Sequence, residues 1–215
     1  MTIELRQETP NDYAEAENLM REAFWNVYAP GCSEHYLLHI MRSSPQFIPE
    51  LAWVATEANH LVGAIYAMRG QVENDLSAMY DVLTLGPIGV QPSHQRHGVG
   101  RSLIEQMCHE ATRMGHRTIV LCGDPAFYSK VSFLPAERFG IRTAQNTYLP
   151  ALQVRPLLEN AMDNLSGRYV EDPVYHVDAK AVEHFDHTFP AKVRVSGTPT
   201  QQRLLELLAQ EKPAF

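Results

Sequence analysis

Residues 85–90 read Leu-Gly-Pro-Ile-Gly-Val, residues 95–100 read Gln-Arg-His-Gly-Val-Gly, and residues 120–128 read Val-Leu-Cys-Gly-Asp-Pro-Ala-Phe-Tyr. In chain order they predict an apolar strand, a glycine turn that opens a helix, and a second apolar strand followed by a phenol. Free N–H groups at a glycine-rich helix start carry partial positive charge and attract anions. The stretch therefore predicts a site for a phosphate-bearing ligand, with the hydroxyl of Tyr128 about one strand away.

The helix and the strand after the glycine turn follow clear patterns. From Gly98 to Met114 the apolar residues fall on one helical face, and residues 118–122 form a short apolar run typical of a buried parallel strand. Strand, helix and strand then make one right-handed crossover. Asp124-Pro125 predicts the start of another helix, because aspartate is a good N-cap and proline suits the first helical position.

The strand predicted over 79–90 contains the pair Gly86-Pro87. Proline cannot donate to a sheet ladder, so inside a strand it indicates an edge or a bulge. We predict a bulge rather than a strand end at Leu85, because the residues from Ile88 to Val90 are again apolar. A bulge would separate this strand from its neighbour and leave backbone groups free to meet a ligand.

Composition is that of an ordinary globular protein of 215 residues with one substantial core. The formal charge, 18 − 25 = −7, does not favour a nucleic-acid partner and would weakly steer a cationic amine. No signal-peptide pattern and no apolar run of membrane-spanning length is present, so we expect no membrane association and a cytoplasmic location. Cys108 and Cys122 are expected to be core thiols.

Periodicity predicts further strands over 2–6, 51–56, 60–69 and 148–155, and further helices beginning near Pro10, Ser33 and Pro199. Residues 157–190 show little periodicity. We therefore divide the chain into a domain over 1–156 and a C-terminal extension over 157–215 that packs on the core or on a partner subunit. The leucine-rich end of this extension is compatible with a homodimer.

Two other phosphate motifs fit the glycine turn poorly. A Walker A loop needs an upstream glycine and a Gly-Lys pair, whereas Gly100 is followed by Arg101-Ser102. A dinucleotide fingerprint needs three spaced glycines, and only Gly98 and Gly100 are present. A nucleotide-binding protein stays as an alternative that predicts stabilisation by ATP or NAD rather than by coenzyme A.

The stretch resembles the Gcn5-related N-acetyltransferase (GNAT) superfamily. Its central motif, Gln/Arg-x-x-Gly-x-Gly/Ala, is matched by Gln95, Gly98 and Gly100, and its second signature by residues 127–133, Phe-Tyr-Ser-Lys-Val-Ser-Phe. More narrowly, the segment looks like the predicted acetyltransferases of the YhbS type. The resemblance covers about the first 155 residues in element order, and it implies an α/β (α+β) fold with a mixed central sheet flanked by helices.

The resemblance also implies roles in binding acetyl-CoA as the cosubstrate, without a metal. Ile88 and Val90 would pair with the pantetheine arm, and the N–H near Gly89 or Val90 would hold the oxyanion. Tyr128 would protonate the departing thiolate. The backbone N–H groups that would cradle the pyrophosphate are those of Arg96, His97, Gly98, Val99, Gly100, Arg101 and Ser102.

The general base is the open question, because no Glu stands at the end of the central strand. Asp81 and Glu73 could relay a proton through water, and we name Asp81 as the candidate. Asp124 is explained by capping, and Ser132 stands where the superfamily usually has glycine. Aromatic residues of the first half of the chain could line the acceptor pocket: Trp25, Tyr28 and Trp53.

His184 and His187, near Asp178 and Asp186, do not have a spacing that defines a metal site, and we expect none. The sequence thus predicts an enzyme that transfers an acetyl group from acetyl-CoA to a primary amine of a small molecule or peptide. The alternative is a non-catalytic acyl-CoA-binding or regulatory module of the same fold. Such a module would have no need of Tyr128.

Overall fold

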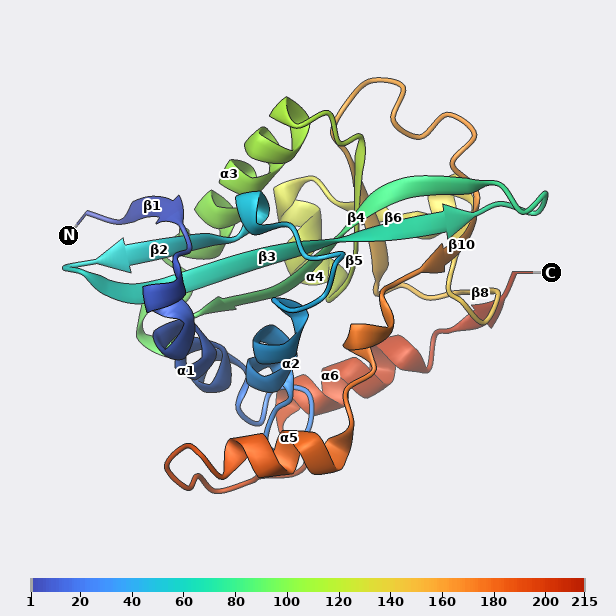
Figure 1. Ribbon diagram of the computed structural model, residues 1–215. Helices are drawn as coiled ribbons and strands as arrows, with labels where there is room; N and C mark the ends of the chain where they lie inside the picture. Colours follow the sequence, from blue (N-terminus) through green and yellow to red (C-terminus); the bar gives the residue numbers. More distant parts are fainter. Residues whose placement is uncertain (1, 215) are drawn as a thin grey trace.

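The computed structural model describes residues 2–214 and contains one large mixed sheet with helices on both faces (Figure 1). Within these residues nine strands form the sheet, in the order β1-β2-β3-β4-β5-β9-β6, with β10 on β3 and β7 on β10. The strands of this sheet are β1 (Glu4–Gln7), β2 (Trp53–Glu57), β3 (His60–Glu73), β4 (Met79–Val90), β5 (Thr118–Cys122), β6 (Leu134–Pro135), β7 (Ile141–Arg142), β9 (Leu152–Pro156) and β10 (Gly167–Val170). A separate pair joins β8 (Thr147–Tyr148) to β11 (Lys212–Pro213).

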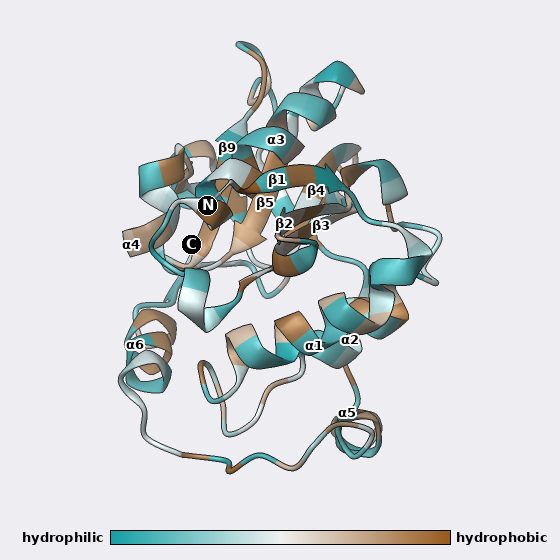
Figure 2. Ribbon diagram, turned by 90° about the vertical axis from the view of Figure 1, so that its left-hand side faces the viewer, coloured by the Kyte–Doolittle hydropathy of each residue, from teal (hydrophilic) through white to brown (hydrophobic). Residues whose placement is uncertain are grey.

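The helices divide between the two faces of the sheet (Figure 2). The α-helices are α1 (Tyr13–Phe24), α2 (Glu34–Met41), α3 (Val99–Arg113), α4 (Pro125–Tyr128), α5 (Ala179–Asp186) and α6 (Pro199–Leu208). Short 3-10 turns occur at η1 (Pro10–Asp12), η2 (Pro49–Leu51), η3 (Pro92–His94), η4 (Ser129–Val131), η5 (Ala136–Phe139) and η6 (Pro173–Tyr175). None of the helices within residues 2–214 is long and apolar enough to span a bilayer.

Helical spacing of apolar residues explains this layering. On α3, Leu103, Ile104 and Met107 lie on one stripe and are fully buried against one face of the sheet. On the other face, Leu19 of α1 and Leu38 of α2 are equally buried in a second cluster. The two apolar layers enclose the sheet, as predicted for a mixed α/β fold.

The central strand β4 carries the predicted bulge. Ile65 of β3 pairs with Ile88 and Ala67 pairs with Leu85, so Gly86 and Pro87 stand opposite a single β3 residue. Pairing of β4 with β5 is confined to Leu83–Ile119 and Thr84–Val120 among the described residues. Beyond Thr84 the two strands therefore part, and one edge of β4 is open.

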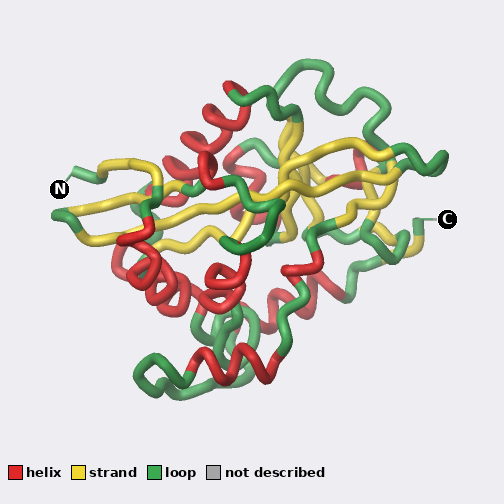
Figure 3. Tube along the Cα trace, in the orientation of Figure 1, coloured by secondary structure: helices red, strands yellow, loops and turns green. Residues whose placement is uncertain are grey.

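The C-terminal segment returns to the main sheet. β4 pairs along one edge of β3. The other edge of β3 pairs with β2 at residues 60–65 and with β10, antiparallel, at residues 71–73. α5 and α6 then lie on the side of the sheet that carries α1 and α2 (Figures 1 and 3). Residues 157–190, which show little periodicity in sequence, thus contain β10, η6 and α5.

The predicted strand over 148–155 is interrupted. Residues Leu149 to Ala151 form a turn closed by a 2.9 Å hydrogen bond from the Leu152 N–H to the Leu149 carbonyl. Pro150, within this turn, has no N–H to give to a ladder. Only β9 joins the main sheet, while β8 pairs with β11.

Candidate active site

The glycine turn opens α3 in the predicted manner. Arg96 and Gly98 have φ values of +65° and +89°, and Gly98 is the N-cap of the helix. The first N–H to donate back is that of Ser102, which bonds the Gly98 carbonyl at 3.0 Å. The N–H groups of the first turn have no earlier helical carbonyl to bond, so they remain available to an anion.

A cavity of about 800 Å³ runs from this helix start into the gap between β4 and β5. The bulge and open edge of β4, the start of α3, the end of β5, α4, the α1–α2 region and the segment after β10 all contribute to it. The lining residues are Phe24, Tyr28, Glu34, Leu37, Thr84, Leu85, Gly86, Pro87, Ile88, Val90, His94, Gln95, Arg96, Gly98, Gly100, Arg101, Cys122, Asp124, Phe127, Tyr128, Lys130, Tyr169, Glu171 and Tyr175.

The hydrogen bonds of β4 show which of its backbone groups face the cavity. The Gln91 N–H donates to the Val62 carbonyl of the β3 region at 2.9 Å. Backbone groups alternate along an antiparallel strand, so Gly89 also faces β3, whereas Ile88 and Val90 face the open edge. Gly89 is a glycine because a Cβ there would lie 2.7 Å from the sulfur of Met20 in α1.

The predicted coenzyme residues do not all line the cavity. Gln95 and Arg101 do line it. The Gln95 side chain also donates through Nε2 to the Val90 carbonyl at 3.1 Å, and the Arg101 side chain donates to the Lys130 carbonyl at 2.8 Å. Val99 is instead a core residue. The side chains of His97 and Ser102 are exposed and outside the cavity lining.

Tyr128 lines the cavity from α4. Its ring lies against Gly123, where any Cβ would overlap it. Phe127 and Phe133 hold the ring at edge-on centroid distances of 4.9 and 5.5 Å. Burial raises the pKa of Tyr128 above its ordinary value, so the hydroxyl stays protonated and can act as a proton donor. Asp124 caps α4 by accepting from the Ala126 N–H at 2.9 Å, as predicted.

The structure does not bring the candidate base Asp81 together with Tyr128. Asp81 is exposed at the start of β4, accepts a 3.0 Å hydrogen bond from Gln71, and lines a different pocket. It lies two residues before the paired Leu83 and Thr84, whereas the gap between β4 and β5 opens after them. Glu73 is likewise occupied, because it forms an ion pair with Arg168 at 2.8 Å.

Two other carboxylates line the cavity, Glu34 at the start of α2 and Glu171 after β10. Burial raises the pKa of both. Glu34 accepts a 2.9 Å bond from the Ser33 N–H. The sequence analysis missed both residues as candidate proton acceptors, because no motif marks them.

The prediction that Cys122 is a core thiol is wrong. Cys122 lies at the end of β5 and lines the cavity instead of the core, whereas Cys108 is buried as expected. Burial, with a contribution from Glu171, raises the pKa of Cys122 to about 11. The thiol is therefore protonated near neutral pH and is a poor nucleophile.

The segment after β10 closes the far end of the cavity. The Tyr169 hydroxyl lies 2.7 Å from the Thr84 hydroxyl, and the Tyr175 hydroxyl donates to the Gly86 carbonyl at 3.0 Å. Tyr175 thereby satisfies a carbonyl that the bulge leaves unpaired with β3. Of the aromatic residues expected in the acceptor pocket, Tyr28 lines the cavity, whereas Trp53 packs against the core and Trp25 lies under Arg21.

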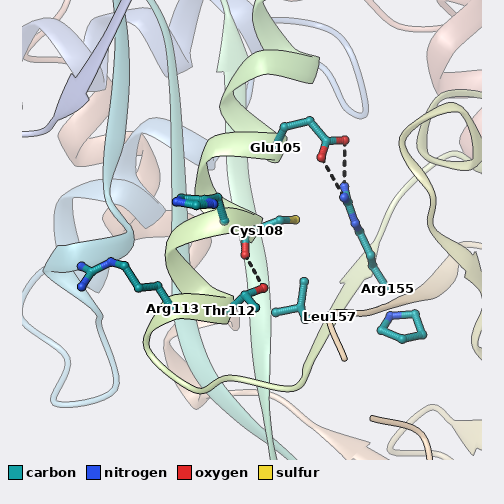
Figure 4. A pocket seen from close by; sticks show the side chains of 8 residues that line it. Glu105, Cys108, Thr112, Arg113, Arg155 and Leu157 are labelled. Atoms are coloured by element: carbon teal, nitrogen blue, oxygen red, sulfur yellow. Dashed lines mark hydrogen bonds and ion pairs between the residues drawn. The ribbon is translucent and has the colours of Figure 1, made fainter. Parts of the chain in front are cut away.

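Within residues 2–214 no group of three or more His, Cys, Asp or Glu side chains is arranged to hold a metal ion. Asp186 instead accepts a 2.6 Å bond from Arg21, and His187 lies 3.5 Å from Glu183. A separate pocket lies between α3 and β9 (Figure 4), where Glu105 and Arg155 form a bidentate pair at 2.8 and 3.1 Å. This ion pair joins α3 to β9 across the pocket.

A mixed sheet that parts at a bulged central strand, with a helix N-terminus and a phenol at the gap, places the protein among α/β acyltransferases. The model of the acetyltransferase (GNAT) family matches residues 15–133, more than half of the chain. The chain therefore belongs to this family, and the resemblance seen in its sequence is confirmed.

Individual relatives agree. The chain is 25% identical over 166 residues to the uncharacterized N-acetyltransferase YhbS of Escherichia coli K12, covering 76% of this chain and 92% of that protein. The structure of YhbS in complex with CoA matches with a TM-score of 0.73 and 22% identity, covering 81% of this chain and 92% of YhbS. The structure of a GNAT family acetyltransferase of Brucella melitensis in complex with acetyl-CoA matches with a TM-score of 0.65 and 22% identity. The match covers 81% of this chain and 98% of that protein. These matches confirm the fold.

Proposed function

We propose that this acyltransferase moves the acetyl group of acetyl-CoA directly to a primary amine while both are bound. The observation that carries the proposal is the single cavity that joins the start of α3, the open edge of β4 and Tyr128. The solved relatives hold CoA or acetyl-CoA, which is the kind of ligand such a cavity suits. No residue of the proposal depends on a metal.

The donor would lie along the cavity in an extended form. The N–H groups of Gly98, Gly100 and Arg101 would hold the diphosphate, aided by the helix dipole. The backbone groups of Ile88 and the N–H of Val90 would pair with the amide groups of the pantetheine arm in the manner of an added strand. Acetyl-CoA supplies an acetyl group already activated as a thioester.

We assign a residue to each chemical step. Glu34 or Glu171 would take a proton from the substrate ammonium, because a protonated amine has no lone pair with which to attack. The freed nitrogen would attack the thioester carbon while the Ile88 or Val90 N–H stabilises charge on the carbonyl oxygen. As the carbon–sulfur bond breaks, Tyr128 would give its proton to the departing thiolate, and the newly bonded nitrogen would return a proton to the tyrosinate as it becomes the neutral amide.

Cys122 supports direct transfer over a route through an acetylated cysteine. Its raised pKa keeps the Cys122 thiol protonated near neutral pH, which makes it a poor nucleophile. The protein's main contribution is then orientation of the two substrates, which can lower the barrier by roughly 7–11 kcal/mol.

The test is thiol release from acetyl-CoA with a panel of amines, comparing wild type with Tyr128→Phe. We expect kcat to fall about 10²–10⁴-fold while the KM for acetyl-CoA changes less than about 3-fold. Tyr80→Phe is the matched control, because Tyr80 lies on β4 but outside the cavity. Equal activity of wild type and Tyr128→Phe would remove Tyr128 from the mechanism.

Melting temperatures separate this function from its alternatives. A ligand that binds the native state raises the melting temperature with its concentration. Stabilisation by acetyl-CoA without thiol release from any amine would point to a non-catalytic acyl-CoA-binding module. Stabilisation by ATP or NAD but not by CoA would point to a nucleotide-binding protein.

A further inference from the structure

A second cavity of about 410 Å³ adjoins the first one and is covered by α6. We call it the α6 chamber. The two cavities share Tyr28, Glu34, Cys122 and Asp124, so the chamber opens beside the residues proposed to carry the chemistry. The lining residues of the chamber are Val27, Tyr28, Glu34, Cys122, Gly123, Asp124, Ala151, Thr200, Arg203, Leu204 and Leu207.

The C-terminal segment holds α6 in place as the outer wall of the chamber. Thr198 and Gln201, at the N-terminal end of the helix, both donate to the Asn26 carbonyl at 3.1 Å. Farther along, Arg203 bonds Asp124 at 3.0 and 3.2 Å. The helix thus bridges the α1–α2 loop and the start of α4, and its residues Leu204 and Leu207 line the space between them.

Charge and polarity divide the chamber into two parts. Its interior is apolar, with Leu204, Leu207 and Val27 among its walls. Arg203 neutralises Asp124, which leaves Glu34 as the lining carboxylate that has no cationic partner among the described residues. A ligand that fits must therefore present an apolar body and, next to it, a positive charge.

We propose that the α6 chamber binds the apolar body of the acceptor, so that the acceptor is an amine carrying an aromatic or branched aliphatic group. Glu34, at the junction of the two cavities, binds the ammonium. This inference rests on the proposed acetyl transfer and names its substrate class. A cavity of about 150 Å³ can hold benzene, so the chamber has room for an arylalkyl group.

Glu34 then determines which amines are accepted, because it fixes where the nitrogen of the acceptor lies. With the apolar body under α6, the nitrogen lies beside Glu34 at the wall that Cys122 shares with the main cavity. Burial raises the pKa of Glu34, which makes the carboxylate a better acceptor for the ammonium proton. An amine with a polar body would leave its own polar groups without partners among the leucines.

The experiment compares 2-phenylethylamine with ethanolamine as acceptors. Leu204→Trp fills the chamber, and Leu205→Trp is the matched control because Leu205 is 65% exposed and does not line it. A hydrophobic pocket discriminates about 10–200-fold per methylene group. We expect kcat/KM for 2-phenylethylamine to fall at least about 10-fold in Leu204→Trp, with ethanolamine changed less than about 3-fold. Leu205→Trp should resemble wild type.

Thr200→Trp provides a second test, since Thr200 lines the chamber from an exposed position where a larger side chain does not disturb the core. The inference is overturned if Leu204→Trp and Thr200→Trp each change kcat/KM for the two amines alike. It is also overturned if the wild-type protein has the higher kcat/KM for ethanolamine. In either case thiol release still supports the acetyl transfer itself. Absence of thiol release with every amine would instead overturn the proposed function.

Discussion

The two walls of the main cavity are made in different ways. The coenzyme wall, formed by the bulged end of β4, the start of α3, and α4, lies within residues 85–133 and offers mainly backbone N–H groups. The acceptor wall comes from segments far apart in the chain (Figure 1), and its residues include Glu34, Glu171 and Tyr175. A backbone site needs glycines and a fixed spacing, whereas a side-chain site needs only that distant residues meet.

A buried ionic cluster holds the acceptor wall together. Arg21 of α1 donates to Asp186 of α5 at 2.6 Å, and His35 of α2 lies 3.2 Å from the same carboxylate oxygen. Arg21 and His35 are at most 1% exposed, and Phe185 and Phe189 pack on the His35 ring. The cluster ties α5, and with it the segment between β10 and α6, to the first two helices.

The largest expected effect concerns the coenzyme wall. A Cβ at Gly100 would make ordinary contacts with Val90 and Phe127 at 3.6 and 3.8 Å, so Gly100→Asp should fold. A carboxylate in the first turn of α3 interacts favourably with the helix dipole but repels a diphosphate. We expect the Kd for CoA to rise at least about 100-fold, or about 2.7 kcal/mol, with an unchanged or higher melting temperature.

Ser102→Asp is the control for Gly100→Asp, because it adds the same charge to the same turn outside the cavity. Isothermal titration of each variant with CoA measures the two Kd values. The Kd of Ser102→Asp should differ less than about 5-fold from that of the wild type. Equal losses in the two variants would mean that the α3 start acts only as a diffuse positive field, and the coenzyme wall as described would be wrong.

The next largest effect concerns the cluster behind the acceptor wall. Burial lowers the pKa of His35 to about 4, against an ordinary value of 6.5. Between these values the unfolded state binds the proton and the folded state does not, so stability is full above pH 6.5 and declines as the pH falls toward 4. From pH 7.5 to pH 5 we expect a loss of about 2 kcal/mol in the free energy of unfolding.

Denaturant unfolding at the two pH values checks this expectation. His35→Gln should remove most of the loss between pH 7.5 and pH 5, and His187→Gln, on an exposed side chain, should leave it unchanged. Hydrogen exchange at pH 5 should speed up in α5 before α3, because the cluster ties only α5 to α1 and α2. Faster exchange in α3 first would show that the cluster does not separate the two walls.

The same division explains what could be predicted from the sequence. The bulge at Pro87, the α3 start at Gly98 and the cap at Asp124 are each fixed by local chemistry, and all three are confirmed. Glu34 and Glu171 could not be predicted, because a carboxylate becomes a site residue only when burial and neighbours change its chemistry. Asp81 is predicted as the base because it lies on the central strand, but position along the strand does not show where the strand parts from β5.

The strands that support the C-terminal part of the acceptor wall could not be predicted for a further reason. β10 is four residues long and finds its partner on β3 about 95 positions earlier, so no local alternation of useful length marks it. The predicted strand over 148–155 failed at Pro150, where a local turn competes with the ladder. Long-range pairing and short elements are where periodicity carries least information.

The smallest expected effect tests how Gln95 of the central motif works. Its side chain bonds the Val90 carbonyl at an exposed position, which holds the end of β4 beside the start of α3. Loss of one such bond costs about 0.5–1.5 kcal/mol, so Gln95→Ala should weaken CoA binding about 2- to 12-fold. His97→Ala, two residues farther along the chain and outside the cavity, should have no effect.

Gln95→Arg distinguishes a positioning role from direct contact with the coenzyme. Arginine keeps an N–H donor within reach of the Val90 carbonyl, so titration with CoA should give nearly the wild-type Kd. A loss in Gln95→Ala as large as that in Gly100→Asp would mean that Gln95 itself contacts the diphosphate. The coenzyme wall would then depend on a side chain as well as on its backbone, and its contrast with the acceptor wall would narrow.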